Sequence, residues 1–151
     1  MTPIKLYEWI TGTMSNFTKP FQENEDLFNQ AKAFWSHLDG SLMIAIVIFL
    51  VLGIALAAFY YKPYNEKPGR HYRPQYWFFF LAVTFVLTFV VTLGFECFAV
   101  KPVLKGAAML ELKIAIVNAF YALIIYLLTS VAWCNWFPTN AYRLLKFKRQ
   151  I

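Results

Sequence analysis

The sequence predicts an all-α integral membrane protein with three transmembrane helices, preceded by one or two short amphipathic helices. The chain of 151 residues is 60% hydrophobic and 15% charged, whereas about a quarter of the residues are charged in a typical soluble domain. The charges flank three long apolar runs, at residues 42–61, 76–100 and 114–137. As a helix that rises about 1.5 Å per residue, each run is long enough to cross roughly 30 Å of hydrocarbon. A transmembrane barrel is excluded, because its strands would be about ten residues long with alternating polarity.

The first 40 residues are predicted to form an amphipathic segment with two short helices. Thr2 followed by Pro3 is typical of a helix start. Asn24 is placed to cap a second helix, and Gly40 is placed to end it. The apolar residues of this second helix share one face: Leu27, Phe28, Ala31, Phe34, Trp35 and Leu38. Such a helix either lies on the membrane surface or on a partner, or packs on the protein's own helices, and both alternatives stay open.

The first membrane helix, residues 42–61, contains no side chain that is charged at neutral pH. Gly53 and Ala57 share a face, and small residues four apart let two helix backbones approach closely. We therefore predict a helix-packing contact at Gly53 and Ala57. Tyr60 and Tyr61 end the helix as interfacial anchors.

The second membrane helix, residues 76–100, carries a polar stripe on an otherwise apolar surface. The stripe consists of Thr84, Thr88, Thr92 and Glu96, each four residues from the last. A carboxyl group inside a membrane helix is costly unless it faces water or a partner, so the stripe is the first candidate for a functional site.

Two interpretations of the stripe compete. Several copies could assemble with their stripes turned inward and line a pore with hydroxyl groups and a ring of acids. Alternatively, the threonine hydroxyls bond to their own backbone carbonyls and the stripe packs against a neighbouring helix. Glu96, near the end of its helix, would then pair with Lys101 or Lys113. We favour the packing interpretation, because a carboxyl group that can reach the headgroup zone does not require a pore.

Basic residues gather in the loop 62–75 and in the basic C-terminal tail 138–151. The loop contains a cluster of Arg70, His71 and Arg73, which could contact acidic lipid headgroups, a nucleotide phosphate or an acidic partner. The tail could lie along the membrane surface. For both regions we favour the simpler interpretation, ordinary positive charge on the cytoplasmic side.

The charge distribution predicts an orientation. The loop and the tail carry four Lys or Arg each, whereas the first 40 residues carry three lysines against five acids. We therefore place the C-terminus and the loop in the cytoplasm and the N-terminus outside, in a multi-pass protein of a bacterial inner membrane. Cys97 and Cys134 would then lie near opposite membrane surfaces, so no intramolecular disulfide is expected.

The sequence contains no P-loop, GxGxxG, GxSxG or HExxH motif. Its two histidines, His37 and His71, have no helix-spaced His, Cys or acidic partner suited to a metal. Basic and aromatic residues do not interleave far enough to predict nucleic-acid binding. We therefore expect neither an enzyme, a metal site nor a cofactor.

The function we expect is that of a non-catalytic membrane subunit that anchors or scaffolds an oligomeric complex. Three helices bury little surface on their own, and the second is rich in phenylalanine, which suits packing between subunits. The expected partners are membrane lipids and either further copies of the chain or a larger complex. The alternative is a small homo-oligomeric channel or pore-forming effector lined by Thr84, Thr88, Thr92 and Glu96.

Overall fold

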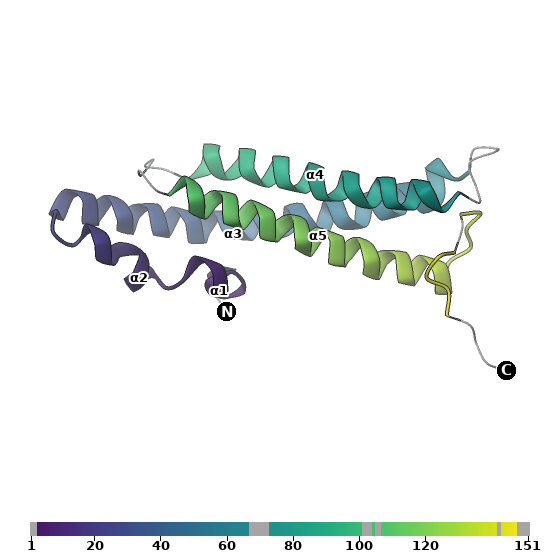
Figure 1. Cartoon of the computed structure of the whole chain (residues 1–151), viewed down its shortest axis with the longest axis horizontal. Helices are drawn as coiled ribbons and strands as arrows, with labels where there is room; N and C mark the ends of the chain where they lie inside the picture. The colour runs from purple at the N-terminus through teal and green to yellow at the C-terminus, as the bar shows by residue number, and fades with distance from the viewer. Residues whose placement is uncertain (1–2, 67–72, 101–103, 105–106, 142, 148–151) are drawn as a thin grey trace. The chain divides into compact units, whose positions relative to one another are not determined.

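The structure is a computed structural model of the whole chain, and Figure 1 shows its course. It describes residues 3–66, 73–100, 104, 107–141 and 143–147.

Three long helices carry the fold: α3 (Glu25–Phe59), α4 (Pro74–Ala99) and α5 (Ala108–Trp136). Each is long and apolar enough to cross a membrane, and they include most of the three apolar runs. Shorter helices precede them, and the described residues contain no strand. The predicted fold class is therefore confirmed.

Helix α3 differs from the prediction, because it runs unbroken from Glu25 to Phe59 and Gly40 does not end it. Asn24 does cap the helix, since its Oδ1 accepts hydrogen bonds from the backbone N–H groups of Asp26 and Leu27 at 3.1 and 3.2 Å. Gly40 is not in the left-handed conformation that ends helices. The polar and apolar stretches on either side of residue 40 thus belong to a single helix.

The N-terminal segment, residues 3–24, packs on the protein's own helices. It contains the short helices η1 (Pro3–Leu6), α1 (Glu8–Thr11), α2 (Met14–Thr18) and η2 (Lys19–Phe21). Gly12 separates α1 from α2 with a φ of 70°, a value that glycine adopts without strain.

Aromatic contacts hold this segment on α3. The ring of Phe17 lies 5.5 Å from that of Phe34 and 5.3 Å from that of Trp35. Phe34 and Leu38 are fully buried. The apolar face that the sequence predicts for residues 24–38 is therefore covered by the chain itself in part, which is one of the two alternatives left open above.

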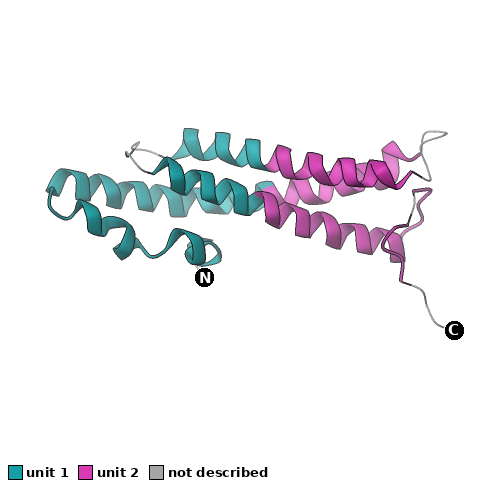
Figure 2. Ribbon diagram, viewed as in Figure 1, with its two compact units in different colours: residues 1–48, 89–118 teal, residues 49–88, 119–151 magenta. Residues whose placement is uncertain are grey.

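The chain divides into two compact units, and the boundary falls within each long helix (Figure 2). Unit 1 contains residues 1–48 and 89–118, and unit 2 contains residues 49–88 and 119–151. In unit 2 a cluster of buried side chains forms the apolar core: Ala57, Tyr60, Tyr61, Trp77, Phe80, Tyr126, Cys134 and Ala141.

In unit 2, α3 passes directly into the π-helical turn η3 (Tyr60–Tyr64). Pro63 lies inside this turn and has no N–H group to donate, so the regular hydrogen-bond pattern of the helix cannot continue. Side chains bond to the carbonyls there: Asn65 donates to Tyr60 O, and Thr139 Oγ1 donates to Tyr61 O at 2.8 Å. The Asn65 bond is local, whereas the Thr139 bond ties the end of α3 to the segment that follows α5.

Candidate functional site

All four side chains of the polar stripe on α4 are completely buried within the chain. The structure gives the three threonine hydroxyl groups three different environments. The packing interpretation expects each of these groups to bond to a backbone carbonyl of α4. Thr84 Oγ1 does so, donating to Phe80 O at 2.8 Å. Thr92 Oγ1 instead accepts a hydrogen bond from Asn118, and Thr88 Oγ1 has no partner among the described residues.

In unit 1, Asn118 bonds to three other parts of the chain. We call Asn118 and its partners Tyr7, Ala45 and Thr92 the amide cluster. The Nδ2 of Asn118 donates to Ala45 O on α3 at 3.1 Å and to Thr92 Oγ1 on α4 at 3.2 Å. Its Oδ1 accepts a hydrogen bond from the hydroxyl of Tyr7 in the N-terminal segment. Asn118, Thr92 and Tyr7 are all fully buried, so one α5 amide holds α3, α4 and the N-terminal segment together.

Glu96 is bonded to α3 rather than to a lysine. Its Oε2 lies 2.9 Å from Ser41 Oγ, which also lies 2.8 Å from Leu38 O. A serine hydroxyl has a single hydrogen to donate, so these two acceptors share it. Glu96 Oε1 is buried and has no partner within the described residues. The carboxyl group is therefore incompletely hydrogen-bonded.

Of the two lysines that the sequence offers as partners of Glu96, the structure describes Lys113. Lys113 is exposed on α5, and Glu96 bonds to Ser41 in its place. Lys101 lies outside the described residues, as do Arg70 and His71 of the basic cluster. Arg73 is described and exposed.

In unit 2, α3 and α5 approach each other closely at Gly53. A Cβ atom added to Gly53 would lie 2.8 Å from Ile125 Cβ and 2.9 Å from Ala122 O. Ala57, one turn further along α3, is fully buried. Gly53 therefore lies against α5, and Ala57 lies on a buried part of α3.

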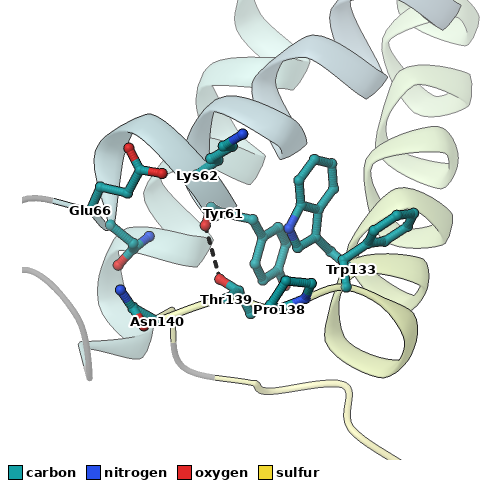
Figure 3. Close-up of a pocket in the computed structure, with 9 residues that line it drawn as sticks. Tyr61, Lys62, Glu66, Trp133, Pro138, Thr139 and Asn140 are labelled. Atoms are coloured by element: carbon teal, nitrogen blue, oxygen red, sulfur yellow. Dashed lines mark hydrogen bonds between the residues drawn. The ribbon is translucent and has the colours of Figure 1, made fainter.

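A pocket of about 360 Å³ opens in unit 2, between the end of α3 and the residues that follow α5 (Figure 3). We call it the interfacial pocket, and its lining combines aromatic rings, amides and two charged groups: Tyr61, Lys62, Asn65, Glu66, Trp133, Phe137, Pro138, Thr139 and Asn140. The rings of Tyr61 and Trp133 stack at 6.1 Å and 10°. The sequence predicts Tyr61 to be an interfacial anchor, but its contact with Trp133 is not predictable from local pattern, because the two residues are 72 positions apart.

Both cysteines are free, Cys97 exposed in unit 1 and Cys134 buried in unit 2. The Sγ of Cys134 lies 3.3 Å from the hydroxyl of Tyr61. Among the described residues, no group of His, Cys, Asp and Glu side chains is arranged to hold a metal ion.

The site that sequence reasoning misses is the amide cluster. Asn118 is the one amide within the third apolar run before Asn135, and an amide in an apolar helix is itself a signal that a partner must lie opposite. Those partners lie 26, 73 and 111 residues away in sequence, so their identity depends on tertiary contacts. In comparisons with known proteins, no protein-family model, curated protein or solved structure matches the chain.

Proposed function

We propose that the protein is a non-catalytic membrane subunit that anchors or scaffolds an assembly. The observation that carries this proposal is the complete burial of the polar stripe within a single chain. A pore between several copies would need the stripe on the outside of each chain, facing the common axis. Here Thr92 and Glu96 bond to the chain's own Asn118 and Ser41, so the polar groups of α4 contribute to the internal fold.

The outer surfaces support the same proposal. Helix α4 exposes large apolar side chains that can contact lipid or a neighbouring subunit: Phe78, Phe79, Val86, Val90 and Phe98. The N-terminal segment is held in place by Tyr7 and Phe17, yet it leaves Trp9 72% exposed. An exposed tryptophan on a fixed segment is the type of anchor around which protein interfaces form.

The alternative function is a channel, and two buried polar atoms without hydrogen-bond partners favour it. Thr88 Oγ1 and Glu96 Oε1 are buried without hydrogen-bond partners in the described residues. Buried polar atoms usually have partners, and groups that lack them are common in sites that bind water or ions.

Ion flux separates the two functions. Full-length protein reconstituted in liposomes should conduct no more than empty liposomes, and Glu96→Gln should behave identically, because the stripe is buried inside the chain. The control is gramicidin added to the same liposomes, which shows that flux is detectable. Conduction by the wild type, with a cation selectivity that Glu96→Gln changes, would overturn the scaffold proposal.

The scaffold proposal also predicts a stable assembly. Tagged full-length protein extracted in mild detergent should migrate as a complex of constant stoichiometry. Trp9→Ala should weaken that complex, whereas Trp136→Ala, which removes a tryptophan that is 78% exposed on α5, should not. The proposal would be contradicted if the wild type and both variants were all monomeric and no partner protein co-purified at constant stoichiometry.

We further propose that the N-terminal segment lies outside the cell and that loop 62–75 and the tail lie in the cytoplasm of a bacterium. In a Cys97→Ser background, cysteines introduced at the exposed positions Ser15 and Glu66 test this orientation. Buried Cys134 contributes little background. In intact cells an impermeant maleimide should label Ser15→Cys and not Glu66→Cys, and the reverse pattern would overturn the orientation.

A further inference from the structure

We propose that the interfacial pocket binds the phosphoethanolamine headgroup of a membrane phospholipid. The residues that carry this assignment are Tyr61, Lys62, Glu66, Trp133, Thr139 and Asn140, all of which line the pocket (Figure 3). The proposal does not depend on the scaffold function, because it concerns the chain's own surface.

The pocket lies where a lipid headgroup would be. Tyr60 and Tyr61 end the first apolar run, and Trp133 and Phe137 end the third. Tyrosine and tryptophan concentrate at the level of the headgroups. A volume of about 360 Å³ is also within the range of small-molecule sites, roughly 300–1,000 Å³.

Opposite charges line the pocket without neutralising each other. Lys62 and Glu66 are both exposed, and within the described residues neither forms an ion pair. Phosphoethanolamine carries a phosphate and a primary ammonium joined by two carbons. Lys62 offers an ammonium to the phosphate, and Glu66 offers a carboxylate to the lipid's ammonium, so both charges meet complementary groups.

The walls of the pocket are already fixed. Thr139 is tied to the carbonyl of Tyr61, and Asn65 is tied to the carbonyl of Tyr60. Trp133 stacks on Tyr61, and its ring centre lies 5.3 Å from that of Phe137. A pocket whose walls are fixed loses little conformational entropy on binding.

The lining distinguishes phosphoethanolamine from other headgroups. A quaternary choline group is recognised by a cage of several aromatic faces, whereas Tyr61 and Trp133 lie parallel to each other and do not enclose a cation from several sides. A primary ammonium can instead donate hydrogen bonds to Glu66 and to the amide oxygen of Asn140. Anionic headgroups such as phosphatidylglycerol lack a cation for Glu66 and would be repelled by it.

Native mass spectrometry of the full-length protein in detergent tests the assignment. Phosphatidylethanolamine, phosphatidylcholine and phosphatidylglycerol with the same acyl chains are titrated separately. We expect phosphatidylethanolamine to bind about tenfold more tightly than the other two, since one charge-assisted hydrogen bond is worth about that factor. Glu66→Gln should remove the preference over phosphatidylcholine, and Lys62→Gln should weaken binding of phosphatidylethanolamine about tenfold.

Matched controls are Glu23→Gln and Lys19→Gln, two exposed charges of the N-terminal segment that should leave binding unchanged. Equal affinity for the three lipids, tighter binding of phosphatidylglycerol, or unchanged binding in Glu66→Gln would each overturn the proposal. Soluble O-phosphoethanolamine should bind more weakly than the lipid, because it lacks the acyl chains that contact the apolar surfaces of the membrane helices. If it binds as tightly, the occupant is a soluble molecule and the lipid assignment is wrong.

Discussion

Replacing Gly53 by alanine should destabilise the protein by about 1–3 kcal/mol, the usual cost of overpacking a close contact. The added Cβ would lie 2.8 Å from Ile125 Cβ and 2.9 Å from the backbone oxygen of Ala122. Ile125 is branched at Cβ and therefore stiff, and a backbone oxygen in a helix cannot move alone. The two helices must therefore separate, which reduces packing along their contact. Unfolding of the purified protein in mixed micelles, followed by far-UV circular dichroism, measures the loss.

Gly94→Ala is the matched control, because an added Cβ at Gly94 meets nothing within 4 Å. Alanine is a better helix former than glycine by about 1 kcal/mol in water. Gly94→Ala should therefore leave stability unchanged or raise it, and the difference between the two variants reports the contact at Gly53. Equal stability of the two variants would mean that α3 and α5 do not approach this closely.

Replacing Asn118 by leucine should destabilise the protein by about 2–4 kcal/mol. The substitution removes the hydrogen bonds to Tyr7, Ala45 O and Thr92. Hydrogen bonds between membrane helices average about 0.6 kcal/mol, and a buried polar group left without a partner adds about 1–3 kcal/mol. The N-terminal segment should also detach, so trypsin should cleave after Lys5, an exposed residue of that segment, faster than in the wild type.

Asn29→Leu is the matched control, since Asn29 is exposed on α3 and the same substitution there removes no buried partner. Tyr7→Phe and Thr92→Val each remove one hydroxyl from the amide cluster and should show intermediate losses. Combining them in a double-mutant cycle shows whether the two bonds act as a unit. Stability and cleavage like those of the wild type in Asn118→Leu would contradict the role of the cluster.

The sequence by itself determined the fold class and the position of the apolar spans. Hydrophobic length is read directly from the residues, because a bilayer requires about 20 apolar residues for each crossing. The cap at Asn24 was also predictable, because capping depends only on a side chain and the backbone N–H groups two or three residues later. The prediction that the helix ends at Gly40 was wrong. A glycine ends a helix when it adopts the left-handed conformation, but Gly40 does not adopt it and α3 continues to Phe59.

Only the tertiary structure decided where the polar residues point and what they meet. Thr84, Thr88, Thr92 and Glu96 lie on one face of α4 by spacing alone, but spacing does not say whether that face meets another copy or the same chain. The answer depends on contacts between residues far apart in sequence, such as Ser41 with Glu96, 55 residues away. Thr92 and Glu96 have partners because α5 supplies Asn118 and α3 supplies Ser41, and no local pattern encodes such a pairing.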